Sequence, residues 1–149
     1  MLKLANKGAF FARIYQKDIL MLEIMRQLVD GGPKTVGPFH HAVSAGDFHF
    51  ITGQMPTLPD DPTKVVAGGI EEQTARVMDN LALVLDGLGS GFDRVVFARV
   101  YLVNFQDLYR MNAVYTRYFQ SDQLPARTCI GVTGLAVGAL VEDDLIVAR

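Results

Sequence analysis

Residues 124–129 combine a cation, a thiol and a stiff backbone. Pro125 restricts the chain directly before a predicted strand, and Arg127 follows two residues later. A guanidinium held at the entrance of a strand presents a planar fork of N–H donors that matches a carboxylate. A structural ion pair on the surface is the alternative role for such an arginine. The segment therefore offers Arg127 as a candidate carboxylate-binding residue.

Cys129 lies two residues beyond Arg127 and shares its face of the predicted strand. A cationic neighbour lowers the pKa of a thiol and favours a reactive thiolate. Most free cysteines, however, are small buried side chains. The sequence favours this second role over covalent catalysis.

Three acids interrupt an apolar strand near the end of the sequence. By alternation, Glu142 and Asp144 share one face, and Asp143 lies on the other. A carboxylate on a strand is costly to bury unless it is paired or functional, although a solvated terminal strand explains it equally well. Earlier in the chain, Thr52 and Gly53 end another strand. A glycine there lets backbone N–H groups approach a ligand closely, and a simple turn is the alternative.

Metal and nucleic-acid binding find little support in the sequence. His40 and His41 are adjacent and point to opposite faces of a strand, His49 is distant, and the single cysteine forms no Cys-x-x-Cys pair. We therefore expect no metal site. The net charge is −2, whereas a generic nucleic-acid-binding protein carries a basic surplus.

The spacing of the apolar residues predicts the helices and strands that position these candidate residues. The order of elements is β-β-α-β-α-β-β, which favours an α/β (α+β) sheet with both helices on one face. The other face, with Phe97 and Tyr101, would then be exposed and would form an oligomer contact. We expect strands at 39–45, 48–52, 94–103, 127–133 and 140–148, helices at 70–88 and 108–119, and a loop at 56–69.

The first residues differ from the rest of the chain. The Gly31-Gly32-Pro33 break separates an N-terminal extension, residues 1–33, from a folded domain, residues 34–149. Residues 1–17 carry only basic charges, which is typical either of a mitochondrial presequence or of an extra helix or upstream start. We expect a cytoplasmic protein, or a mitochondrial one if the extension is a presequence, with no membrane partner.

Residues 37–149 resemble the RidA/YjgF/YER057c/UK114 family of reactive-intermediate deaminases. The matching pieces are Gly37-Pro38-Phe39 with Ala42-Val43, ITGQMP at 51–56, Gln73 with Asn80-Leu81, Asn112-Ala113-Val114-Tyr115 with Phe119, and PARTC at 125–129. The resemblance implies a chorismate-mutase-like fold and a homotrimer with clefts between subunits. It also implies hydrolysis of 2-enamine or 2-imine intermediates to 2-oxo acids and ammonia, without metal or organic cofactor.

The resemblance also implies roles for individual residues. Arg127 matches the arginine that binds the substrate carboxylate, and Cys129 matches a cysteine that lines the pocket and helps to place water. Gly53 matches the turn glycine, with Thr52 in place of serine. Asn112 matches a helix asparagine near the cleft.

Two positions depart from the family pattern. Phe39 replaces a tyrosine, and Asp144 replaces the glutamate that positions the attacking water, with Glu142 two residues earlier. Aspartate is about 1 Å shorter, and such a displacement is costly in catalysis. The alternative function is therefore a trimer that binds small 2-oxo acids or related carboxylates without turnover. RNA cleavage, claimed for some relatives, is disfavoured by the acidic charge balance and by the lack of a suitable histidine pair.

Overall fold

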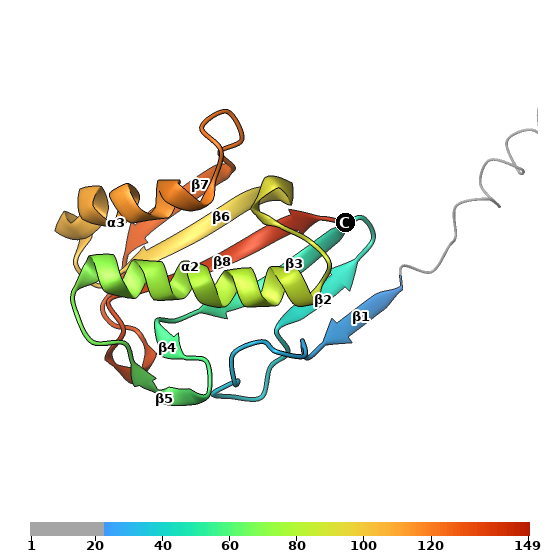
Figure 1. The fold of residues 1–149 in the computed structure, drawn as a ribbon, viewed down its shortest axis with the longest axis horizontal. Coiled ribbons are helices and arrows are strands. Elements are labelled where there is room, and N and C mark those ends of the chain that lie inside the picture. Colours follow the sequence, from blue (N-terminus) through green and yellow to red (C-terminus); the bar gives the residue numbers. More distant parts are fainter. Residues whose placement is uncertain (1–22) are drawn as a thin grey trace, which may run out of the picture.

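A computed structural model of the chain describes residues 23–149. Its main feature is a six-stranded sheet in which only β6 and β7 run parallel (Figure 1). The strands, in their order across the sheet, are β1 (Ile24–Gln27), β2 (Ala42–Ala45), β3 (Phe48–Gln54), β8 (Val141–Ala148), β6 (Val95–Leu102) and β7 (Ala126–Gly131).

Two helices, α2 (Ile70–Gly87) and α3 (Leu108–Tyr115), cover one face of this sheet (Figure 1). Fully buried side chains of α2, such as Met78 and Leu81, pack against Ala98 and Val100 of β6 and Leu145 of β8 in one core. This arrangement confirms the predicted mixed α+β fold with both helices on one side. Short 3-10 turns lie at Phe92–Arg94, Phe105–Asp107, Thr116–Tyr118 and Ala136–Gly138.

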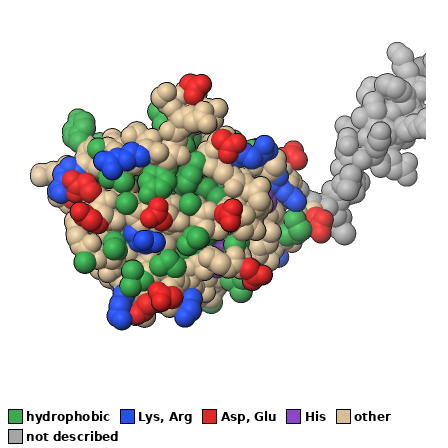
Figure 2. All heavy atoms as spheres, viewed as in Figure 1, with side chains coloured by type: hydrophobic (Ala, Val, Ile, Leu, Met, Phe, Trp, Pro, Cys, Tyr) green, Lys and Arg blue, Asp and Glu red, His purple; other side chains and the backbone are tan. Residues whose placement is uncertain are grey.

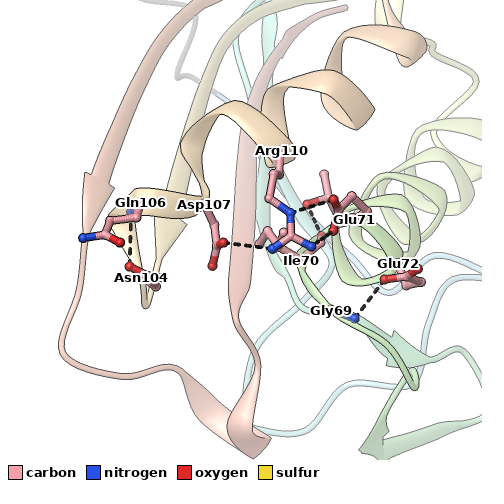
Figure 3. Close-up of polar contacts among 9 residues, drawn as sticks. Gly69, Ile70, Glu71, Glu72, Asn104, Gln106, Asp107 and Arg110 are labelled. Carbon is pink, nitrogen blue, oxygen red and sulfur yellow. Dashed lines mark hydrogen bonds and ion pairs between the residues drawn. The ribbon is translucent and has the colours of Figure 1, made fainter.

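The start of α2 is held by its acidic first turn. The Glu72 carboxylate accepts a hydrogen bond from the Gly69 backbone N–H at 2.8 Å, which satisfies one of the unpaired donors at the helix start. Glu71 accepts two hydrogen bonds from Arg110 of α3, from Nε at 2.7 Å and from Nη2 at 2.6 Å (Figure 3). This bidentate pair joins the two helices.

Two parts of the chain contain more structure than the sequence predicts. The predicted loop at 56–69 contains a small hairpin of β4 (Thr57–Leu58) and β5 (Asp61–Val65). β1 lies inside the expected N-terminal extension, and it pairs with β2 in the main sheet. The sheet therefore begins before Lys34, the expected domain boundary. The pattern of β1 gave no signal because none of its four residues is buried. The basic stretch at 1–17 lies outside the described residues.

Among residues 23–149, none covers the sheet face opposite the helices, which is called the open face below. Phe48 and Phe50 of β3 are 41% and 45% exposed there, and Val96 of β6 is 42% exposed. An irregular pairing between Val95 and Phe97 places Val96 on this open face instead of beside Ala98, where regular alternation along the strand would put it. On the helix side, acidic and basic side chains are mixed with apolar ones (Figure 2), as on a solvated surface. Within residues 23–149, no helix is long and apolar enough to cross a membrane.

Candidate functional site

A pocket of about 310 Å³ opens beside Arg127, between α3 and the start of β7. This volume is at the small end of the range for ligand sites in proteins, which suits a metabolite of a few heavy atoms. Apolar and polar groups both line the pocket, which is bounded by Asn112, Tyr115, Thr116, Leu124, Pro125 and Arg127.

Arg127 is exposed at this pocket and is oriented by an aromatic ring. Its guanidinium carbon lies 4.8 Å from the centre of the Tyr115 ring on α3, within the range of a cation–π contact. None of the ion pairs among residues 23–149 includes Arg127. The guanidinium N–H donors are therefore available to an anion, in a geometry that suits a carboxylate.

Cys129 and Asp143 lie behind Arg127 on the same, helix-covered face of the sheet. Arg127 and Cys129 pair with Ala98 and Val100 of β6, and Val100 pairs with Asp143 on its other side. Burial raises the pKa of the Cys129 thiol, an effect that Arg127 opposes and Asp143 reinforces. The thiol is therefore protonated near neutral pH, which argues against a ready nucleophile.

Asn112 and Tyr115 present polar groups to the same region. Asn112 Oδ1 and the Tyr115 hydroxyl are buried, and neither has a hydrogen-bond partner among the described residues. Buried polar atoms without a partner are uncommon in folded proteins and call for an explanation. At the edge of a pocket, they are groups that a ligand or water can satisfy.

Asp144 lies on the opposite face of the sheet from Arg127. Its Oδ1 accepts a hydrogen bond from Arg99 Nε at 2.8 Å, and its Oδ2 accepts one from the Tyr101 hydroxyl at 3.1 Å. We expected Asp144 to hold water beside a carboxylate bound to Arg127. Within one chain it does not, because strand alternation directs the two side chains to different sides.

Glu142 shares the open face with Asp144 and lies over Gly53. A Cβ atom at position 53 would overlap Glu142 Oε1 and lie 3.0 Å from its Cδ, so the glycine makes room for the carboxylate. Burial and the nearby charge of Asp144 both raise the pKa of Glu142. Gly53 therefore has a specific role in this structure, which is to admit a carboxylate at the irregular end of β3.

Phe39, Thr52 and Gly53 are distant from Arg127 in the same chain. Thr52 donates a hydrogen bond to the His40 carbonyl at 2.7 Å, and Phe39 and Gly53 line a small cavity beside β3. β8 and β6 separate β3 from β7, which corresponds to about 14 Å at the usual strand spacing. One chain thus brings together Arg127, Cys129 and Asn112, and it holds Phe39, Thr52, Gly53, Glu142 and Asp144 elsewhere.

Sequence reasoning did not assign a site role to Asp143 or Tyr115. Tyr115 was named as part of the Asn112-Ala113-Val114-Tyr115 match, without a role of its own. Alternation correctly separated Asp143 from its two acidic neighbours, but nothing in the sequence showed that β6 lies between β7 and β8. Within the described residues, no three His, Cys, Asp or Glu side chains are grouped to hold a metal ion.

Comparisons with known proteins identify the family. The family model described as endoribonuclease L-PSP matches residues 30–149. The RutC family protein SSO3206 of Saccharolobus solfataricus is 37% identical over 127 residues, which cover 84% of this chain and 99% of the relative. The RutC family protein UK114 of Drosophila melanogaster is 37% identical over 128 residues, with 85% and 91% covered.

A solved structure agrees with these sequence matches. The Rid family protein YyfA of Yersinia pestis has a TM-score of 0.79 and 29% identity, with 85% of this chain and 100% of that chain covered. The fold, the matched length and the relatives lead to the same assignment. The chain belongs to the RidA/YjgF/YER057c/UK114 family.

Proposed function

We propose that this protein hydrolyses reactive 2-imino and 2-enamino acids to 2-oxo acids and ammonia. The observation that carries the proposal is the Arg127 guanidinium, which is exposed at a pocket of about 310 Å³ and takes part in none of the ion pairs of residues 23–149. Family membership supports the same chemistry.

In the proposed reaction, Arg127 binds the substrate carboxylate and holds carbon 2 in the pocket. The oxygen of a water molecule bonds to carbon 2 while the electron pair of the C=N bond moves to nitrogen. One proton passes from the water oxygen to nitrogen, which gives an amino alcohol. The remaining hydroxyl proton then passes to nitrogen as the C–N bond breaks and the C=O bond forms, which releases ammonia. A 2-enamino acid first becomes the imine by moving a proton from nitrogen to carbon 3. Holding the reactants in this geometry removes much of the entropic barrier.

The proposed active unit is a homotrimer, in which a second copy completes the pocket. Exposed Phe48, Phe50 and Val96 on the open sheet face support association, because monomers rarely expose such a surface. Phe39, Thr52 and Gly53 would then reach Arg127 from a neighbouring subunit. We propose that the carboxylate of Asp144, or of Glu142, accepts the proton of the water across the interface between two subunits.

The test compares 2-iminobutyrate decay with wild-type protein, Arg127→Ala and Arg110→Ala. The imine is generated in the cuvette by an amino-acid oxidase, and 2-oxobutyrate is measured above the spontaneous rate. Losing a charge-assisted hydrogen bond costs about 1.5–3 kcal/mol, so Arg127→Ala should lower kcat/KM by about 10- to 150-fold. Arg110→Ala is the matched control because Arg110 pairs with Glu71 outside the pocket. Equal rates for all three proteins would refute the mechanism.

The second candidate function is binding of 2-oxo acids without turnover. Two features of Asp144 favour binding without turnover. Its side chain is shorter than glutamate, and its carboxylate oxygens already accept hydrogen bonds from Arg99 and Tyr101, so they are less available to activate water. Calorimetry with 2-oxobutyrate would then show binding that depends on Arg127, while the imine assay would show no acceleration.

RNA cleavage, which the family model's description names, has less support in this chain. General acid–base cleavage of RNA calls for accessible groups that titrate near neutral pH. His41 accepts a hydrogen bond from the Val29 N–H at 2.8 Å, and His49 lies 2.6 Å from Ser44 Oγ. Both imidazoles are buried and hydrogen-bonded. His40 is exposed, but it has no second accessible histidine among the described residues to serve as its acid or base partner, so we do not propose this activity.

A further inference from the structure

Asp143 is a buried acid that the proposed reaction does not use. Its residue is 1% exposed, and neither carboxyl oxygen has a hydrogen-bond partner among the described residues. Burying a charged carboxylate without a partner is very costly, and such groups respond by remaining neutral. Asp143 therefore needs a physical account that core packing does not supply.

The sheet register places Asp143 on the same face of the sheet as Arg127. Asp143 and Cys129 lie on either side of Val100, with their strands about 10 Å apart at the usual spacing. Arg127 is on the same face, two residues before Cys129 on β7. Asp143 thus shares a sheet face with the guanidinium that the proposed function assigns to the substrate carboxylate, with β6 between their strands.

Few ionisable groups face Asp143. β7 contributes Arg127 and Cys129, α3 contributes Tyr115, and none of the buried residues of α2 is ionisable. Asp144 is adjacent along β8 but points to the other face. Burial raises the pKa of both Cys129 and Tyr115 above their ordinary values, and Arg127 stays charged. Asp143 is therefore the only carboxyl in this group of described residues.

The direction of its titration follows from the same surroundings. Burial and the charge of Asp144 raise the pKa of Asp143 well above its ordinary value, and Arg127 opposes this shift. Asp143 is neutral at low pH and becomes an anion as the pH rises through this raised pKa. A negative charge then appears on the same sheet face as the cation of the pocket, and the two groups interact electrostatically.

We propose that the protonation of Asp143 controls how strongly Arg127 binds the carboxylate of a substrate or product. When Asp143 is neutral, the full positive charge of Arg127 attracts the carboxylate of the bound molecule. Ionised Asp143 repels the guest carboxylate and neutralises part of that positive charge. The inference rests on the proposed function only in taking Arg127 as the carboxylate site, and it requires no turnover.

Thermodynamic linkage makes this proposal measurable in two ways. Affinity for a 2-oxo acid should fall as Asp143 ionises, and binding should reciprocally draw a proton onto Asp143. Coupling energies between two sites typically change affinity by about 5- to 150-fold. The carboxylate of 2-oxobutyrate remains ionised over the whole range, so it contributes no titration of its own.

The experiment is calorimetric titration with 2-oxobutyrate from pH 5 to 9, in pairs of buffers that differ in ionisation enthalpy. For wild-type protein we expect a rise of at least about fivefold in Kd with pH, together with proton uptake on binding. Asp143→Asn should bind with a nearly constant Kd and without that uptake. Asp86→Asn, a change at an exposed acid of α2, should behave as wild type.

Each outcome decides between the two proposals. Binding that depends on Arg127 but is insensitive to pH, with no proton uptake, overturns the role of Asp143 and leaves the proposed function intact. Absence of binding at any pH removes the carboxylate site itself, and both proposals with it. The proton uptake is measured on wild-type protein, so the result does not depend on whether Asp143→Asn folds.

Discussion

Asn80 is a fully buried amide of α2 that holds the chain just beyond Gly53, where β3 ends. Its Nδ2 donates hydrogen bonds to the Met55 carbonyl at 3.0 Å and to the Thr57 carbonyl at 2.9 Å. Its Oδ1 has no partner among the described residues. The side chain therefore acts through Nδ2, by joining the helix layer to the segment between β3 and β4.

Replacing Asn80 with alanine should lower the free energy of unfolding by about 2–4 kcal/mol. Each hydrogen bond contributes about 1 kcal/mol net, and each carbonyl left without a donor adds a desolvation cost. Removing the amide also leaves a small cavity at a site that is 0% exposed. The Asn80→Ala change thus removes two hydrogen bonds at once from a well-packed position.

The assay is urea unfolding followed by far-ultraviolet circular dichroism, at one fixed protein concentration because association alters apparent stability. Asn104→Ala is the matched control, since Asn104 Oδ1 accepts a hydrogen bond from the Gln106 N–H at 3.2 Å on the surface (Figure 3). Loss of such a surface cap costs about 0.5–1 kcal/mol. If Asn80→Ala is no more destabilising than Asn104→Ala, the reasoning about the buried amide is wrong.

Two further predictions concern the site. Gly53→Ala should destabilise the protein because its Cβ would overlap Glu142. The double variant with Glu142→Ala should recover most of the lost stability in a double-mutant cycle measured by urea unfolding, and additive effects of the two changes would contradict this prediction. Arg127→Ala should slow the reaction of Cys129 with a disulfide reagent at pH 8, because Arg127 opposes the burial that raises the pKa of the thiol; an unchanged rate would contradict it.

The elements with regular apolar spacing were predictable from the sequence. α2 shows a helical period over five turns, and the strand that became β6 is apolar on both sides. β1, β4 and β5 were missed because they are short and carry no alternation of buried and exposed residues. The side-chain direction of Val96 also could not be predicted, because it depends on an irregular pairing between two strands.

The site was predictable only in part, for a geometric reason. Alternation along one strand correctly separated Asp143 from Glu142 and Asp144. Relating that strand to Arg127 requires the order of strands across the sheet, which local sequence patterns do not contain. The resemblance grouped Arg127 with Asp144, and whether they meet between two subunits stays a prediction.

The inclusion of β1 in the sheet has a practical consequence for anyone trimming this protein. The Val29 side chain packs against Gly87 at the end of α2, and its N–H is bound by His41. A shortened version starting at Lys34 would leave β2 as an exposed edge strand whose unpaired backbone groups could pair with other molecules and cause aggregation. Expression vectors should therefore retain the chain from at least Glu23, even though the family match begins at residue 30.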